Sequence, residues 1–151
     1  MDKPEVVDAI RAALQDRLAT TQEALAHAQA AATADEARAE NRYDTRALEM
    51  SYLAAGQSER VAELRRAVTL YHFHASIPCA EAVPGALIEL EGARSGWYFL
   101  APCGPSLTVE VAGETVHVVT TATPVGLALL GRVEGDEVQF GPNLGTVASV
   151  R

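Results

Sequence analysis

The sequence has no long hydrophobic run and no secretory start. None of its apolar stretches approaches the roughly 18 residues that a membrane-spanning helix requires. The chain opens with Met-Asp-Lys-Pro-Glu, which is not the basic and then apolar pattern of a signal peptide. We therefore expect a cytoplasmic protein that spans no membrane. Its 151 residues, 48% of them hydrophobic, suffice for one compact domain and an appendage.

Cysteine is scarce. Only Cys79 and Cys103 occur, too few for a disulfide framework, so free thiols are expected in a reducing compartment. With His72 and His74 they offer zinc-type ligands, but no Cys-x-x-Cys or His-x-x-x-His pair accompanies them. Buried thiols beside a histidine pair at a helix end are therefore the favoured interpretation.

Positive charge is also in short supply. The chain carries 12 Lys and Arg against 20 Asp and Glu, a formal net charge of -8. Affinity for nucleic acid depends on a surplus of basic side chains, so this composition argues against generic nucleic-acid binding. Any such contact must be local, or must come through a partner protein.

Proline and glycine are nearly absent from the first half of the chain. Between Pro4 and Phe73 there is one glycine, Gly56, and no further proline, while alanine, leucine, glutamate and arginine dominate. This composition favours helix, and two apolar series at helical spacings predict two helices. The series are Val7, Ile10, Leu14, Leu18, Leu25 and Ala28, then Leu48, Tyr52, Val61, Leu64, Val68 and Tyr71.

The segment between the two series is expected to reverse the chain. It has no large apolar residue except Tyr43, so a turn within 32–44 predicts an antiparallel coiled-coil hairpin. Thr33 followed by Glu36 resembles a capping box, and Asn41 or Asp44 could cap the second helix instead. A helix of ~30 residues extends ~45 Å, so this arm should protrude from a small domain.

The second half has the composition of a β domain, with frequent proline and glycine between short runs of Val, Leu, Tyr and Phe. The expected fold class is therefore α+β: a hairpin at 1–74, a linker at 75–79 and a small β-rich domain with one short helix at 80–151. Expected strands are 86–91, 97–101, 107–111, 115–120, 137–140 and 146–150, and the expected helix is 124–130. Of Trp97, Tyr98 and Phe99, alternation should send two inwards or onto an interface.

One segment resembles a known family. Thr123-Pro-Val-Gly-Leu-Ala-Leu-Leu-Gly-Arg-Val-Glu-Gly-Asp-Glu-Val138 is similar to the C-terminal signature of the bacterial Gre transcription elongation factors (GreA/GreB-like). In that signature a Ser/Thr-Pro turn, a small helix ending in Leu-Leu-Gly and a Gly-Asp-x-Val strand entry follow in order. Glu40-Asn-Arg-Tyr43 also resembles, with one residue fewer, a run just past the tip of Gre hairpins.

The resemblance implies a factor that binds bacterial RNA polymerase. Its FKBP-like domain would dock at the rim of the secondary channel and its hairpin would enter the channel. The docking residues would lie around the short helix, at Pro124, Leu127 and Leu130. Prolyl isomerisation, known for the FKBP fold, is a remote alternative because a fold does not carry a function and the chain has only 5% aromatic residues.

The resemblance also implies a role for acidic residues at the hairpin tip. In the family's transcript-cleavage members, tip carboxylates help to hold magnesium in the polymerase active site, so that the polymerase hydrolyses backtracked RNA. The chain itself would be an accessory factor and no enzyme. The candidates are Asp35, Glu36, Glu40 and Asp44, of which Asp35, Glu36 and Glu40 would contact the metal. Carboxylate oxygens suit a hard cation.

The tip also departs from the family pattern. The family places an aspartate three residues before the tip glutamate, and Ala37 stands at that position relative to Glu40. This leaves open a factor that occupies the channel without promoting cleavage. Arg38 and Arg42 could contact the 3' end of the nascent RNA, although arginine interleaved with glutamate usually forms solvated pairs along a helix.

Overall fold

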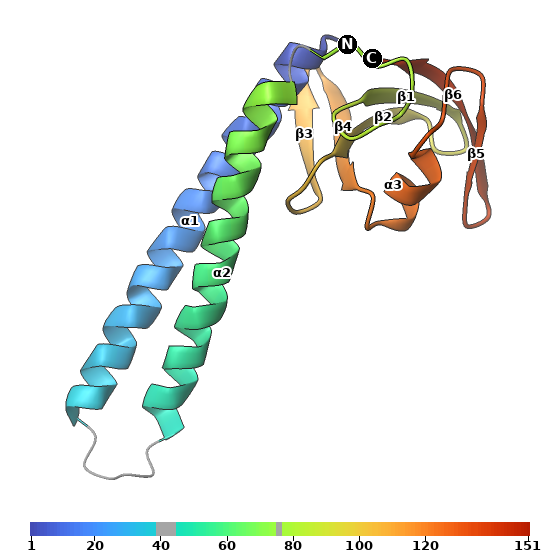
Figure 1. Cartoon of the computed structure of the whole chain (residues 1–151). Coiled ribbons are helices and arrows are strands. Elements are labelled where there is room, and N and C mark those ends of the chain that lie inside the picture. Colours follow the sequence, from blue (N-terminus) through green and yellow to red (C-terminus); the bar gives the residue numbers. More distant parts are fainter. Residues whose placement is uncertain (39–44, 75–76) are drawn as a thin grey trace.

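The computed structural model describes residues 1–38, 45–74 and 77–151. Within the helices, only the backbone is described at 32, 34–38, 45–47, 50 and 72–74. Two long helices, α1 (Lys3–Arg38) and α2 (Thr45–His74), lie side by side and form an arm that projects from a β domain (Figure 1). The expected α+β class and the N-terminal helical hairpin are confirmed. None of the helices in the described ranges has both the length and the hydrophobicity that a membrane span needs.

The end of α1 differs from the capping-box prediction. The helix continues through Thr33 to Arg38, and the Thr33 hydroxyl donates to the Gln29 carbonyl at 3.0 Å. A threonine inside a helix satisfies its hydroxyl in this way, and the surrounding alanines favour continued helix. The prediction that Thr33 begins a new helix is therefore wrong. The alternative caps, Asn41 and Asp44, lie outside the described residues.

The two helices meet along the predicted seam only in part. In the first series, Val7, Ile10, Leu14 and Ala28 are buried and the remaining two residues are half-buried. In the second series, Val61, Leu64 and Tyr71 are buried and Val68 is half-buried. The first series is therefore correct along its whole length, from Val7 to Ala28, and the second series is correct from Val61 to Tyr71.

Leu48 and Tyr52 were wrongly placed in the seam, since their side chains are 54% and 71% exposed. Tyr52 precedes Val61 by nine residues, which is about two and a half helical turns, so it lies on the opposite face of α2. Steps of four and three residues back from Val61 reach Gln57 and Ala54, and both are half-buried. The distal seam of α2 therefore uses small and polar residues, which leaves the larger apolar ones outside.

The β domain is one six-stranded mixed sheet in the order β3-β4-β2-β1-β6-β5. Neighbouring strands are antiparallel except β2 and β4, which are parallel. The strands agree with the predicted ranges to within three residues. They are β1 (Leu87–Gly92), β2 (Gly96–Ala101), β3 (Leu107–Val111), β4 (Glu114–Thr120), β5 (Glu137–Phe140) and β6 (Asn143–Val150). The short helix α3 (Pro124–Leu129) lies between β4 and β5.

The sheet is covered on both faces. Trp97 and Phe99 of β2 pack with Val7, Ile10 and other residues at the base of the hairpin, which we call the hairpin-side core. On the opposite face, Tyr98 packs in the α3-side core with Leu129 of α3. All three aromatic residues of β2 are consequently buried. The expectation of two buried aromatic residues assumed that only one face of the sheet is covered, whereas both faces are.

The hairpin-side core contains residues of both helices and of the sheet, so it joins the arm to the β domain. The two chain termini lie close together at this junction (Figure 1). Lys3 is 7% exposed, and its ammonium donates to the Ile77 carbonyl and, at 3.4 Å, to Cys79 Sγ. Arg151 donates to the Met1 carbonyl at 2.6 Å, and its guanidinium lies over the Trp97 ring. The arm is thereby fixed to the β domain at its base.

Candidate functional site

The first candidate region is the end of the arm. Asp35, Glu36 and Arg38 belong to the last turns of α1, which ends at Arg38. Glu40, Arg42 and Asp44 lie outside the described residues. Carboxylates are the donor type that suits magnesium, so the predicted ligand set fits the ion chemically. Within the described residues, no three His, Cys, Asp or Glu side chains come together as a metal site.

The second candidate region is built around α3. Thr123 precedes the helix with φ -90° and ψ 150°, and its hydroxyl accepts from the Gly126 amide at 3.1 Å. The same hydroxyl donates to the Thr120 carbonyl at 2.8 Å. Pro124 follows in the first turn, where its missing amide proton is not needed. The Thr-Pro pair thus fixes where α3 begins and ties it to the end of β4.

Gly126 allows α3 to lie against β4. A Cβ atom on this residue would be 2.0 Å from the Thr120 carbonyl oxygen, closer than any side chain can approach. The second half of the signature fixes the exit of the helix. Gly131 has φ +77°, and its amide donates to the Ala82 carbonyl at 2.9 Å. The Asp136 carboxylate then accepts from the Val133 amide at 3.0 Å and closes the turn into β5.

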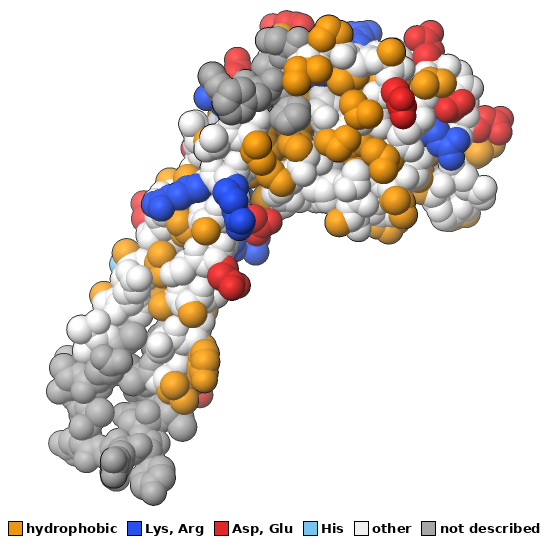
Figure 2. All heavy atoms as spheres, in the orientation of Figure 1, with side chains coloured by type: hydrophobic (Ala, Val, Ile, Leu, Met, Phe, Trp, Pro, Cys, Tyr) orange, Lys and Arg blue, Asp and Glu red, His pale blue; other side chains and the backbone are white. Residues whose placement is uncertain are grey.

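An exposed apolar surface results on and beside α3 (Figure 2). Leu129 points into the core, whereas Leu127 and Leu130 are 64% and 42% exposed. Val133 and Val83 are exposed as well, and backbone pairing of Ala82 with Gly131 and Arg132 brings Val83 alongside. We call the set of Val83, Pro124, Leu127, Leu130 and Val133 the α3 patch. The predicted docking residues Pro124, Leu127 and Leu130 all lie on this surface.

A third exposed surface was missed from the sequence. Leu48, Tyr52 and Leu53 form an apolar strip on distal α2, with exposed fractions of 54%, 71% and 50%. Gly56 follows on the same helix, and a Cβ there would meet nothing within 4 Å. The nine-residue interval between Tyr52 and Val61 could have revealed the strip. It corresponds to about two and a half helical turns, so the two residues cannot lie on the same face of α2.

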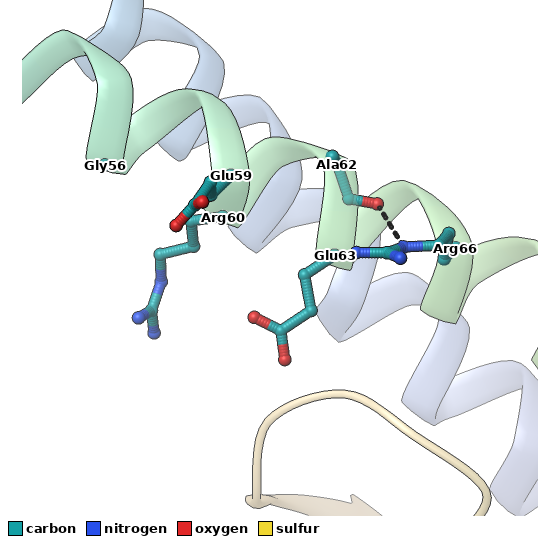
Figure 3. A pocket seen from close by; sticks show the side chains of 6 residues that line it. All are labelled: Gly56, Glu59, Arg60, Ala62, Glu63 and Arg66. Atoms are coloured by element: carbon teal, nitrogen blue, oxygen red, sulfur yellow. Dashed lines mark hydrogen bonds between the residues drawn. The ribbon is translucent and has the colours of Figure 1, made fainter.

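Nearer the base, charged side chains line a hollow on the same helix (Figure 3). Its lining residues are Gly56, Glu59, Arg60, Ala62, Glu63 and Arg66. The loop after β2 lies close by, since a Cβ at Gly104 would be 3.1 Å from the Ala67 Cβ atom. Burial, followed by the charge of Glu63, raises the pKa of the Cys103 thiol in this loop, while Arg66 opposes the rise. Among the described side chains, the one ion pair joins Arg11 to Asp8 at 3.2 Å. The described Glu and Arg side chains of α2 therefore form no ion pair with one another, and the alternative of solvated pairs at Arg38 and Arg42 lies outside the described side chains.

Comparisons with known proteins give similarity in structure only. No family model and no curated protein matches the chain. A crystal structure of GreA factor homolog 1 (Gfh1) of Thermus thermophilus is 20% identical, with a TM-score of 0.37, and the match covers 93% of this chain and 94% of that chain. A structure described as the transcription factor Gfh1 is 17% identical, with a TM-score of 0.38 and coverage of 94% and 93%.

Thermus aquaticus Gfh1 is 15% identical, with a TM-score of 0.37, over 99% of this chain and 96% of that chain. At these TM-scores the similarity carries no argument about function.

Proposed function

We propose that the chain is a Gre-type transcription factor that docks on bacterial RNA polymerase through the α3 patch and inserts its arm into the secondary channel. One observation supports this proposal above all. The segment that resembles the Gre signature, 123–138, presents an exposed apolar surface on a β domain, and a long two-helix arm projects from the same domain.

The junction suits a protein that positions a distant tip. Val7, Ile10 and Leu14 of α1 and Leu64 and Tyr71 of α2 share the hairpin-side core with the sheet. Docking of the β domain would therefore set the direction of the arm. The 36 residues of α1 extend about 54 Å at 1.5 Å per residue, so the tip would act far from the docking surface.

Docking can be tested with Leu127→Asp in the full-length chain. Because Leu127 is 64% exposed, a charge there should leave the fold intact. A charge at the centre of an apolar contact should weaken binding to purified core polymerase by at least about tenfold. Leu144→Asp is the matched control, since Leu144 is 51% exposed and lies outside the α3 patch. Equal affinity of both variants and the wild type would reject the α3 patch as the docking surface.

We further propose that the tip assists cleavage of backtracked RNA by the polymerase. Bound magnesium would polarise the RNA phosphate and activate water. Asp35, Glu36 and Glu40 would share this ion with the polymerase, and Asp44 would add negative charge beside them. Arg38 and Arg42 would contact the 3' end of the RNA locally, which agrees with the lack of a general basic surplus.

This role predicts a separation of binding from activity. Glu40→Ala, and Asp35→Ala combined with Glu36→Ala, should reduce stimulated cleavage in stalled elongation complexes by about 10 to 100-fold, as for lost metal-site contacts. Polymerase affinity should stay unchanged, and added magnesium should partly restore cleavage. Glu59→Ala, an exposed carboxylate on α2 away from the tip, should have no effect.

A second candidate function is that of a channel-occupying modulator that promotes no cleavage. Ala37, at the position where the family carries an aspartate, favours it. The same assay decides between the two: wild-type protein that binds polymerase but stimulates no hydrolysis at any magnesium concentration identifies the modulator.

A further inference from the structure

A small hollow on the β domain has no part in the proposed function. It lies on the α3 side of the sheet, between the β1–β2 turn, the strands β2 and β4, and the first turn of α3. Its lining residues are Arg94, Ser95, Tyr98, His117, Val119 and Val125. Its volume of about 380 Å³ falls within the usual range of small-molecule sites.

Tyr98 supplies a donor that the protein itself barely uses. The residue is only 6% exposed, yet its hydroxyl lies 3.5 Å from its acceptor, the Arg94 carbonyl. Hydroxyl hydrogen bonds are usually about 2.7–2.8 Å long, so this contact is weak. Burial raises the pKa of Tyr98, which keeps the phenol protonated, while the positive charge of Arg94 acts in the opposite direction. A better acceptor inside the hollow would satisfy this buried group.

The charge of the hollow contrasts with that of the chain. None of its six lining residues, all in the described part of the chain, is acidic, although the chain has a net charge of -8. Residues 77–151 contain three basic residues, Arg94, Arg132 and Arg151. Arg151 is bound to Met1 and stacked on Trp97, and Arg132 Nε donates to the Ala128 carbonyl. Arg94 lines the hollow, its guanidinium carbon lies 5.9 Å from the centre of the Phe140 ring, and its positive charge acts on the Tyr98 hydroxyl.

The remaining walls complete an amphipathic site. The His117 ring packs 5.2 Å from the Tyr98 ring, and its imidazole offers an N–H even when neutral. Ser95 adds a hydroxyl. Val119 and Val125 are half-buried and give the hollow an apolar side. The lining of the hollow thus includes both hydrogen-bond donors and apolar methyl groups.

We propose that this hollow binds a small aliphatic carboxylate, with its charged group at Arg94, Tyr98 and His117 and its hydrocarbon tail against Val119 and Val125. A planar carboxylate matches the paired N–H groups of a guanidinium and accepts further donors. The apolar wall favours a ligand with a short hydrocarbon tail over inorganic phosphate.

The test is a titration of the full-length, isotope-labelled protein with isovalerate, followed by NMR. Saturable shifts are expected at the amides of Ser95, Tyr98, His117 and Val125. Isovaleramide, which has the same shape but no charge, should bind at least tenfold more weakly. Absence of saturable shifts, equal binding of the amide, or binding of inorganic phosphate in place of isovalerate would overturn the proposal.

Three variants test which side chains of the hollow contact the ligand. Arg94→Ala should weaken isovalerate binding at least tenfold, and Tyr98→Phe, which removes only the hydroxyl, should weaken it severalfold. Arg132→Ala, which removes an exposed arginine outside the hollow, should bind as the wild type does. Wild-type affinity of the Arg94→Ala variant, with its fold confirmed by the same spectra, would refute the assigned site. None of these measurements involves polymerase, so their outcome is independent of the proposed function.

Discussion

Replacing Gly126 by alanine would add one methyl group where the first turn of α3 touches the end of β4. The new Cβ would lie 2.0 Å from the Thr120 carbonyl oxygen and 2.6 Å from its carbon. Both are backbone atoms, so no side-chain rotation can relieve the overlap. Either α3 moves away from the sheet or the end of β4 shifts. Both movements pull on the Thr123 hydroxyl, which bonds to Thr120 and Gly126.

The expected cost is the sum of two effects. Overpacking of a tight contact costs about 1–3 kcal/mol, and loss of a helix cap costs about 1 kcal/mol. A total of about 3 kcal/mol should lower Tm by roughly 6–12 °C for a chain of this size. Circular dichroism melts and urea titrations of the full-length protein measure the change.

Gly56→Ala is the matched control because a Cβ there meets nothing within 4 Å. Gly56 lies inside α2, where alanine favours helix over glycine by about 0.5–1 kcal/mol. The two Gly→Ala changes should therefore shift stability in opposite directions. A Gly126→Ala protein as stable as the wild type would refute the contact between α3 and Thr120.

Two further predictions concern the arm and its base. Tyr52→Ala should change the free energy of unfolding by less than about 0.5 kcal/mol because Tyr52 is exposed. Val61→Ala should lower the free energy of unfolding clearly more, because Val61 is buried in the seam. The reverse order in urea titrations would reject the seam as assigned. Burial, and then the neighbouring Cys103, raise the pKa of the Tyr71 phenol in the folded protein. The stability that depends on neutral Tyr71 is therefore complete below the pKa of tyrosine in the unfolded chain, about 10, and is lost as the pH rises above it. Tyr71→Phe should reduce this alkaline loss in melts recorded across that range, and an unchanged pH profile would contradict the assignment.

The sequence by itself determined the local elements of this protein. The absence of proline between Pro4 and Phe73 predicts the long helices, and glycine and proline mark the ends of the strands. Thr123-Pro124 predicts the start of α3, and Gly131 predicts its end, which lies at Leu129 in the structure. These features depend on backbone propensity and on hydrogen bonds between near neighbours, which a short stretch of sequence carries in full.

The seam of α2 was decided by the tertiary structure. Leu48 and Tyr52 are hydrophobic and helical, and only the position of α1 determines which face of α2 is covered. Because Leu64, Ala67 and Tyr71 must meet both α1 and the sheet, they set the rotation of the whole helix. The distal residues follow that rotation, so larger apolar side chains face outwards while Ala54 and Gln57 face the partner helix.

The surfaces likewise depend on the sheet order. Arg94, Tyr98, His117 and Val125 come from four separate segments, and no spacing in the sequence links them. The parallel pairing of β2 with β4 places Tyr98 opposite His117, and the contact of Gly126 with Thr120 brings α3 beside them. Local propensity fixes each segment, but packing across the sheet decides which side chains become neighbours, because that choice minimises exposed apolar area over the whole molecule.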